Sequence, residues 1–172
     1  MLELLERAGA RATFFMVGEQ VQRRPALAAE VLARGHVVAL HGARHRLQTR
    51  LTARQLVEDV ERGLHALEAA TRVRPELHRP PYGVYSPAGL RIVRERGLGP
   101  LLWSKWGKDW RKHTTPARIA ARATRNLAAG DVILLHDADF YSALGSHERT
   151  VAALRLILGE LATRELATVL PA

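Results

Sequence analysis

Two histidines four residues apart are the first sign of chemistry in this sequence. His41 and His45 close the stretch VVALHGARH, in which four apolar residues precede the pair. Neutral imidazoles are common zinc ligands, and this spacing lets both reach one ion from a tight loop or a helical turn. The zinc-protease motif on a helix would have a glutamate between them, whereas Gly42, Ala43 and Arg44 stand here. The pair indicates either a metal site on a loop or two unrelated surface histidines.

A third histidine follows the most apolar run of the chain, DVILLHDAD. At the end of such a run, His136 would be held rigidly and partly desolvated, which suits a proton donor or acceptor near neutral pH. Asp137 or Asp139 could orient the ring, or could cap the following turn. The alternative is a histidine that ends a strand with its ring hydrogen-bonded to the backbone.

Two loops between these histidines add charge and aromatic surface. In RPPYG, Arg79 is a fixed cation, and Tyr82 is the first residue after the double-proline turn with a backbone N–H to offer. An N–H held in a fixed direction is what an oxyanion hole needs. In KDWRK, Asp109 could pair with Arg79, and Trp110 could wall an apolar pocket. The alternatives are an ordinary proline turn and a surface loop anchored by one tryptophan.

Short β-rich runs alternate with stretches of helical spacing along the chain. We expect strands at residues 12–17, 37–40, 76–79, 100–103, 132–135 and 167–170. We expect helices at residues 2–8, 25–34, 52–70, 87–96, 116–129 and 148–164. The boundary residues agree, with an N-cap at Thr52, first-turn prolines at Pro25, Pro87 and Pro116, and glycines after helix ends at Gly35, Gly97 and Gly130.

This alternation predicts an α/β fold in which helices cover a parallel sheet, as a small or incomplete barrel or an open doubly wound sheet. No linker or repeat divides the sequence, so we expect one domain over residues 1–172. In such folds ligands lie at the carboxyl ends of the strands. The four polar segments described above all fall there.

The composition is that of a globular domain, with 47% apolar and 25% charged residues. No apolar run approaches the roughly 20 residues of a membrane span, and residues 1–7 read as a helix start rather than a secretory leader. The absence of cysteine excludes disulfides and thiolate metal ligands. The net charge of +9 comes from scattered arginines without interleaved aromatic residues, which does not favour a nucleic-acid partner.

Taken together and in this order, the segments resemble the polysaccharide deacetylase family (carbohydrate esterase family four, the nodulation-type chitooligosaccharide deacetylases). The resemblance runs from near Leu4 to the C-terminus and is found in ATFFMVGEQVQRRPALAAEVLARGHVVALHGARH, HRPPYGVYS, LLWSKWGKDW and VILLHDAD. It implies a distorted (β/α) barrel and the hydrolysis of N-acetyl groups on an N-acetylhexosamine polysaccharide or a lipid-linked sugar. It also implies a divalent metal, zinc or cobalt, held by one aspartate and two histidines.

The resemblance assigns roles to residues of this chain. His41 and His45 match the two metal histidines, and His136 matches the general acid. Arg79 matches the arginine that orients the catalytic base, and Asp109 matches the aspartate that holds this arginine.

The resemblance also implies a substrate pocket. Tyr82 matches the residue whose backbone N–H polarises the acetyl carbonyl. Trp110, Leu134 and Pro81 match residues of the pocket that accepts the acetyl methyl group.

The chain departs from the family pattern in its first motif, a Thr-Phe-Asp-Asp-Gly-Pro strand end that would precede the helix at Leu2. In the family, the first aspartate is the catalytic base and the second is the third metal ligand. The acids before His41 are Glu3, Glu6, Glu19 and Glu30, all in helical or loop contexts. We therefore expect a barrel without its first strand, weakened metal binding and little or no hydrolysis by this exact chain.

Two smaller departures are Gly42, where the family usually has serine or threonine, and Trp106, where many members have another aspartate. The alternative function is a catalytically impaired protein that keeps the sugar groove and binds a glycan or a partner. An uncovered first-strand position would suit pairing with another copy of the chain. Members of the family often work at the cell envelope, and the sequence itself leaves the location open.

Overall fold

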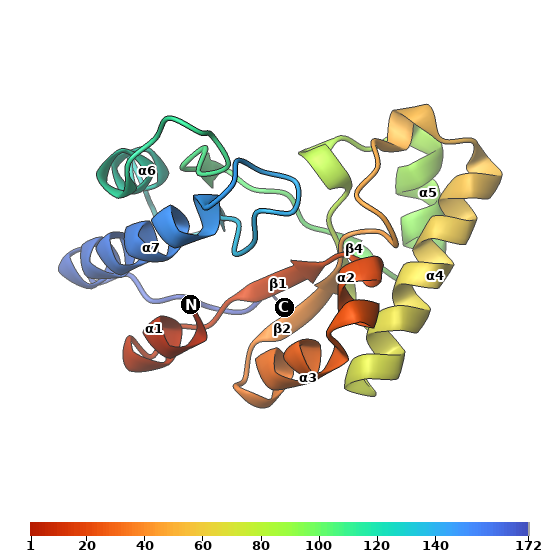
Figure 1. The fold of residues 1–172 in the computed structure, drawn as a ribbon, viewed down its shortest axis with the longest axis horizontal. Coiled ribbons are helices and arrows are strands. Elements are labelled where there is room, and N and C mark those ends of the chain that lie inside the picture. Colours follow the sequence, from red (N-terminus) through yellow and green to blue (C-terminus); the bar gives the residue numbers. More distant parts are fainter. Residues whose placement is uncertain (172) are drawn as a thin grey trace. The chain divides into compact units, whose positions relative to one another are not determined.

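The computed structural model describes residues 1–171 and divides into two compact units. The larger unit comprises residues 11–102 with Leu170 and Pro171. The smaller unit comprises residues 1–10 and 103–169. Figure 1 labels the helices of both units and the strands β1, β2 and β4 of the larger one.

The larger unit is built on a four-stranded sheet whose order is β1-β2-β3-β4 and whose strand pairs are all parallel. Its strands are β1 (Thr13–Met16), β2 (Val37–Leu40), β3 (Leu77–His78) and β4 (Gly99–Pro100). Its helices are α2 (Gly18–Arg23), α3 (Pro25–Ala33), α4 (Ala53–Thr71) and α5 (Pro87–Glu95), with 3₁₀ turns η1 (Gln48–Arg50) and η2 (Pro81–Gly83). The register runs from Thr13 opposite Val37 to Met16 opposite Leu40. This confirms the expected α/β class with a parallel sheet.

Helix α4 is the main support of this sheet, and Figure 1 shows it beside α2 and α3. It begins with a capping box, in which Thr52 accepts from the Gln55 backbone and the Gln55 side chain accepts from Thr52 N–H. Its buried face is apolar apart from two polar residues, Asp59 and Thr71. Leu67 of α4 and Leu40 of β2 are both fully buried, which fixes the helix on the sheet.

The smaller unit contains α1 (Leu2–Arg7), β5 (Lys105–Trp106), α6 (Pro116–Ala123), β6 (Ile133–Leu134) and α7 (Ser146–Thr163). Strands β5 and β6 pair in parallel, with Lys105 opposite Ile133 and Trp106 opposite Leu134. Helices α6 and α7 pack together through a cluster of Ala120, Ala123 and Ile157. This cluster is the apolar centre on which β6 rests.

Three expected elements differ from the structure. The strand expected at residues 100–103 ends at Pro100, because Arg79 takes the carbonyl oxygens of Leu101 and Leu102 that a longer strand would use for pairing. The helix expected at residues 116–129 ends at Ala123. Beyond it, Lys105 Nζ donates to the carbonyl oxygens of Arg125 and Asn126.

The third difference is the strand expected at residues 167–170, since within the described range the chain after α7 forms no strand. Val169 in this segment is 83% exposed and Leu170 is only partly buried, so the segment lacks the fully buried side of a core strand. Helix α2 and strand β5 were not expected. Both are short, which leaves little periodic signal to detect.

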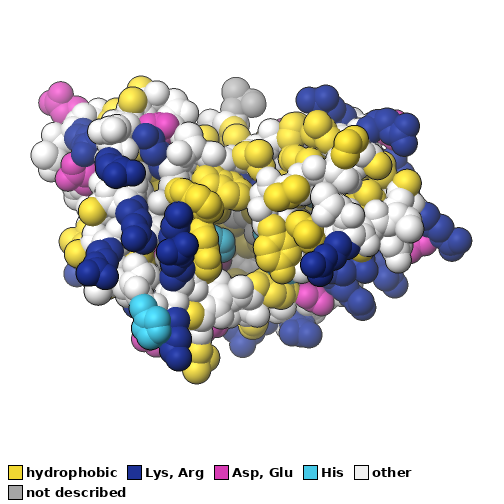
Figure 2. Space-filling model, turned by 90° about the horizontal axis from the view of Figure 1, so that it is seen from above, with side chains coloured by type: hydrophobic (Ala, Val, Ile, Leu, Met, Phe, Trp, Pro, Cys, Tyr) yellow, Lys and Arg dark blue, Asp and Glu magenta, His cyan; other side chains and the backbone are white. Residues whose placement is uncertain are grey.

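No helix within residues 1–171 is both long and apolar enough to cross a membrane. Figure 2 shows Lys and Arg side chains distributed over the visible face and not gathered in one patch on it. Several arginines pair with a glutamate four residues away on the same helix, as Arg34 does with Glu30 and Arg164 does with Glu160. These arginines therefore lie in ion pairs at the surface.

Candidate active site

His41 directly follows β2 and is held in one orientation. Its backbone N–H donates to Met16 O, and its Nδ1 lies 2.7 Å from Arg79 O. A carbonyl oxygen only accepts, so the proton must be on Nδ1 and the Nε2 lone pair is left for a ligand. Burial lowers the pKa of His41 to about 3, which keeps the ring neutral at physiological pH.

His45 lies beside His41, as the spacing of the pair predicts. The two ring centroids are 5.2 Å apart, and the His45 ring also packs edge-on against Tyr82 with centroids 4.7 Å apart. The pair therefore forms one cluster with the RPPYG turn and does not consist of unrelated surface residues.

Asp59 of α4 fixes the loop between the two histidines and was missed by the sequence analysis. Its Oδ2 accepts from Ala43 N–H at 3.0 Å, and its Oδ1 accepts from Arg44 N–H and from Arg46 Nη2. A Cβ at Gly42 would lie 2.7 Å from Asp59 Oδ2, and Gly42 has φ of +80°. Glycine is therefore needed at this turn, because the carboxylate occupies the space that a side chain would fill.

A signal for Asp59 was present in the sequence. It lies three residues after Leu56 and four before Gly63 on the face of α4 that is otherwise apolar. An acid on the buried stripe of an amphipathic helix needs a partner, and a loop rich in N–H groups can supply one.

The RPPYG turn places Arg79 and Tyr82 differently. Arg79 is buried, with Nε donating to Leu101 O, Nη2 donating to Leu102 O, and its guanidinium 3.9 Å from the Phe15 ring centroid. Burial lowers the pKa of Arg79 to about 10, so it keeps its charge at neutral pH. The pairing of this arginine with Asp109 stays a prediction.

Tyr82 has φ of +62°, in the left-handed region that non-glycine residues seldom adopt. Pro81 before it is fully buried, and Gly83 N–H closes the turn on Pro80 O at 2.9 Å. Among residues 1–171, no acceptor is bonded to the Tyr82 N–H. The turn therefore presents one N–H from a strained backbone position, and the role of this N–H as an oxyanion donor stays a prediction.

In the smaller unit, the fully buried Asp109 and the partly exposed His136 form a dyad. His136 N–H donates to Asp109 Oδ2 at 2.7 Å, His136 Nδ1 lies 3.0 Å from Oδ1, and Thr150 Oγ donates to Oδ2 at 2.9 Å. Burial alone would raise the pKa of Asp109, but the hydrogen bonds and charge of His136 and the Thr150 hydroxyl hold it below its usual value. Asp109 is therefore an ionised group that orients the His136 ring.

Asp109 takes the orienting role for which the sequence also allowed Asp137 or Asp139, and the alternative role of capping the following turn holds for Asp139. Asp139 instead caps the next turn, since its Oδ2 accepts from Gly145 N–H at 2.7 Å and lies 3.3 Å from His147 Nδ1. The sequence analysis considered only acids adjacent to His136, whereas its partner comes from 27 residues earlier.

Aromatic side chains adjoin the dyad. The Trp110 ring packs edge-on against the His136 ring with centroids 5.4 Å apart, and the rings of Trp103, Trp106 and Trp110 follow one another at 5.8 and 5.3 Å. Leu134 is buried in β6 opposite Trp106. The structure thus brings Trp110 to His136, and the role of Trp110 and Leu134 in a methyl pocket stays a prediction.

The donor set near His41 and His45 fits a catalytic metal only in part. The neutral His41 ring, held through Nδ1 by a backbone carbonyl, is prepared as a ligand in the way common to metal-binding histidines. However, nowhere in the described range do three His, Cys, Asp or Glu side chains gather as a metal site requires. Two imidazoles do not complete a catalytic zinc site, which normally has three protein ligands.

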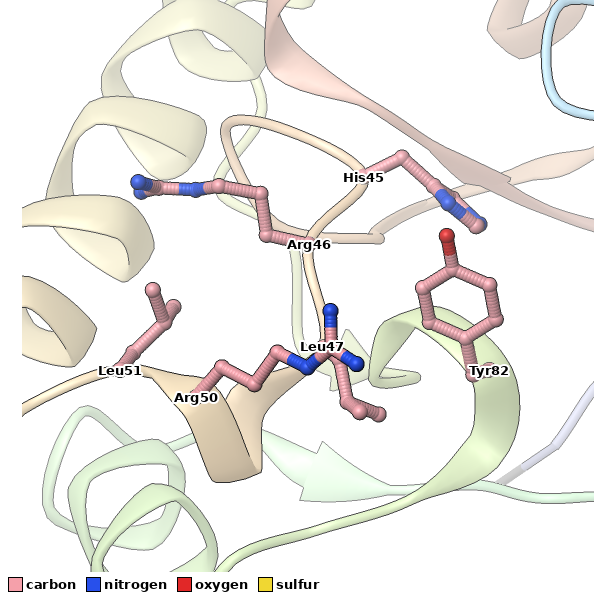
Figure 3. A pocket seen from close by; sticks show the side chains of 6 residues that line it. All are labelled: His45, Arg46, Leu47, Arg50, Leu51 and Tyr82. Atoms are coloured by element: carbon pink, nitrogen blue, oxygen red, sulfur yellow. The ribbon is translucent and has the colours of Figure 1, made fainter.

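A pocket of about 520 Å³ adjoins this cluster in the larger unit. His45 and Tyr82 line it together with Arg46, Leu47, Arg50 and Leu51 (Figure 3). It joins the histidine loop to η1, and its wall has no acidic residue.

Comparison with known proteins links these features to a family. A family model described as polysaccharide deacetylase matches residues 1–100. The peptidoglycan-N-acetylglucosamine deacetylase of Bacillus cereus is 36% identical over 165 residues, which cover 94% of this chain and 73% of that protein. The deacetylase PgdA of Listeria monocytogenes is 27% identical over 161 residues, and there the match spans only 32% of the relative.

Solved structures agree on the fold. A family 4 carbohydrate esterase from Streptomyces lividans, in complex with acetate, matches with a TM-score of 0.88 and 29% identity over 99% of this chain and 84% of that one. A pseudoenzyme from Bacillus anthracis matches with a TM-score of 0.87 and 23% identity over 97% of this chain and 56% of that one. At that identity the second match shows the shared fold alone.

Proposed function

Because the chain belongs to the polysaccharide deacetylase family, we propose that it serves in the hydrolysis of N-acetyl groups on an amino-sugar glycan or glycoconjugate. The observation that carries this proposal is the Asp109–His136 dyad. A buried carboxylate fixes Nδ1 of the imidazole, so that Nε2 is left to exchange a proton with a bound substrate. We also infer that the parallel strands belong to the distorted barrel of this family, without its first strand.

In the reaction that this site would serve, water adds to the carbonyl carbon of an acetamido group, the amide C–N bond breaks, and acetate and a free amine are formed. The Tyr82 N–H would donate to the carbonyl oxygen as negative charge develops on it. His136 would give a proton to the departing amine while Asp109 stays ionised beside it. Trp110, Leu134 and Pro81 would contact the acetyl methyl group.

The family generally uses a divalent metal, and His41 and His45 are the residues of this chain that would contact a zinc or cobalt ion. Since no carboxylate joins them in residues 1–171, we derive no step through a metal. The family resemblance assigns Arg79 to orienting the catalytic base and Asp109 to holding Arg79. The catalytic base itself has no match in this sequence.

The substrate class follows from chemistry that the relatives share. The Bacillus cereus and Listeria monocytogenes relatives are deacetylases of peptidoglycan N-acetylglucosamine. Because this chain spans only part of their length, we extend only the N-acetylhexosamine unit to it, in a polysaccharide or a lipid-linked sugar.

A second candidate function is glycan binding without hydrolysis. The observation that favours it is the incomplete donor set at His41 and His45. Such a protein would still present the Tyr82 N–H to an acetamido carbonyl. Its binding would not respond to chelators.

One assay separates the two functions. We would measure acetate released from chitin oligomers and peptidoglycan fragments, with zinc or with a chelator, by this chain and by a version preceded by a Thr-Phe-Asp-Asp-Gly-Pro strand end. We expect zinc-dependent release by the extended version and a loss of at least about 100-fold in its His136→Gln variant. Zinc binding without acetate release would refute hydrolysis, and chelator-insensitive binding of oligomers would then support the second candidate.

A further inference from the structure

The pocket between the histidine loop and η1 combines two arginines with apolar walls. Its arginines are Arg46 and Arg50, and its apolar walls are Leu47 and Leu51. We propose that this pocket binds an oxyanion, a carboxylate or a phosphate, carried by the glycan, and that Arg50 binds it. This inference rests on the proposed function, because it names the class of glycan that the same site takes.

The two arginines differ in what they already contact. Arg46 Nη2 donates to Asp59 Oδ1 at 3.0 Å, and Figure 3 shows its side chain extending away from His45 and Tyr82. Its charge is therefore committed to holding the histidine loop. Arg50 extends toward the Tyr82 side of the pocket in Figure 3, and it has no carboxylate partner within the described chain. Arg50 is thus the cation of this pocket that is available to bind a ligand anion.

The position of Arg50 is fixed from both sides. The histidine loop before it is held by Asp59, and the capping box at Thr52 begins α4 two residues after it. Between them, Gln48 is buried, with its Oε1 filling the space where Gly89 would place a Cβ. A short turn with both ends fixed limits where the guanidinium can reach, which reduces the entropy lost when it binds an anion.

The guanidinium and the apolar walls together favour an anion over a neutral sugar hydroxyl as the ligand of this pocket. A guanidinium binds a carboxylate or a phosphate through two parallel N–H···O bonds, which are stronger than bonds between neutral groups. Leu47 and Leu51 give the pocket apolar walls, which would strengthen this attraction once a ligand displaces water from beside them. Since no acid lines the pocket, nothing in it competes for the guanidinium.

Tyr82, whose N–H the proposed function assigns to the acetamido carbonyl, also lines this pocket, so one glycan would reach both. The anion would then lie on the acetylated sugar or on the sugar next to it. A lactyl carboxylate on a muramic acid residue and a phosphate on a sugar hydroxyl are the two sources of this charge. A neutral chitin oligomer has neither.

The experiment compares three ligands by NMR titration of the whole chain, namely a muramic-acid-containing tetrasaccharide, N-acetylglucosamine phosphate and neutral chitotetraose. We expect an acidic ligand to bind roughly three- to tenfold more tightly than chitotetraose, as suits an ion pair that stays partly solvated. Arg50→Gln removes the charge and keeps a side chain of similar length, and it should abolish this preference. Arg54→Gln is the matched control, since Arg54 is 89% exposed, pairs with Glu58 and is not in the pocket.

The outcomes separate this inference from the proposed function. A preference for the muramic acid ligand that Arg50→Gln alone removes identifies the carboxylate, and the same result with the phosphate ligand identifies the phosphate. Equal affinities for all three ligands would overturn the inference while leaving glycan binding in place. A preference that persists in Arg50→Gln would also overturn it, and binding of no ligand would overturn both.

Discussion

Asp59 is a single buried carboxylate that organises the histidine loop, and replacing it by asparagine tests this role. The amide keeps the shape but turns one acceptor into a donor that faces Ala43 N–H, Arg44 N–H or the Arg46 guanidinium. We expect Asp59→Asn to lower the free energy of unfolding by about 1–3 kcal/mol in urea titrations. Hydrogen exchange at the Ala43 and Arg44 amides should rise by more than at other amides of the unit.

Glu58→Gln is the control for this change. Glu58 is the preceding residue of α4, is half exposed and pairs only with Arg54 at the surface. Its loss should cost about 0.5 kcal/mol or less and leave exchange at the loop unchanged. Equal effects of the two substitutions would mean that Asp59 does not hold the loop.

Asp109 is the second buried carboxylate that is held by hydrogen bonds. We expect Asp109→Asn to lower the free energy of unfolding by about 1–3 kcal/mol at pH 7. Because the folded pKa of Asp109 is depressed, its stabilisation is present above the unfolded pKa near 4 and is lost as pH falls through the folded value. The difference in unfolding free energy between wild type and variant should therefore shrink below about pH 4.

The ring of His136 reports whether Asp109 acts by positioning. In the wild type, its Nδ1 is tied to Asp109 Oδ1, so the NMR resonances of both ring nitrogens should show one tautomer. Asp109→Asn should move the ring to a mixture of tautomers, whereas Thr150→Val removes one bond to Asp109 and leaves His136 bonded. An unchanged tautomer in Asp109→Asn would refute the positioning role.

At the scale of elements, α4 approaches the histidine loop at a glycine, and Gly63→Ala tests how tight this approach is. A Cβ at Gly63 would lie 2.5 Å from Leu40 Cδ1, 3.0 Å from Ala43 N and 3.1 Å from Gly42 C. The Leu40 methyl can move, but the two backbone atoms belong to the loop held by Asp59. Overpacking costs about 1–3 kcal/mol and the gain in helix propensity is at most about 1, so we expect a net loss of stability.

Gly159→Ala in α7 is the matched control with the opposite sign. It also lies inside a helix, but nothing lies within 4 Å of the added Cβ. We expect this change to raise the free energy of unfolding by about 0.5–1 kcal/mol. Stabilisation by Gly63→Ala as well would show that α4 and the loop have room to separate.

The sequence predicted the elements whose signals are local. Val37–Leu40 is a strand over the expected residues, and Thr52 caps α4 as expected, because an apolar run and a capping residue act over a few positions. Strand β4 ended early because of Arg79, whose hydrogen bonds to Leu101 and Leu102 join residues more than 20 positions apart. No local pattern contains such a bond.

The same division holds for the candidate site. The pairing of His41 with His45 and the presentation of Tyr82 N–H were predicted, since each depends on one loop. The partner of His136 and the role of Asp59 were missed, since each depends on two segments brought together by folding. The residue types on a loop are visible in the sequence. The residues that hold such a loop in place lie in helices and strands far away along the chain, so no local pattern reveals them.

At the scale of the whole molecule, buried neutral histidines make stability depend on pH. His78 is fully buried with Nδ1 2.8 Å from the Tyr85 hydroxyl, and burial lowers its pKa to about 3, as it does for His41. In the unfolded chain both would titrate near pH 6.5. As pH falls below this value the unfolded state takes up protons first, which favours unfolding.

We therefore expect full stability above about pH 6.5 and a loss of up to about 1.4 kcal/mol per histidine for each pH unit below it. Two histidines over two units would cost about 5 kcal/mol, which is comparable with the whole stability of a marginal domain. The protein should thus begin to unfold between about pH 5 and 4, well before most carboxylates are protonated. Urea unfolding at each half unit from pH 7.5 to about 4.5 measures this slope.

His78→Asn identifies the source of the slope. The variant should be less stable than wild type at pH 7, because it loses the contact with Tyr85, yet its stability should fall only about half as steeply with pH. At pH 5 the two proteins should therefore differ less than at pH 7. A slope unchanged by the substitution would mean that His78 takes up its proton within the folded protein, and that the buried site opens without unfolding.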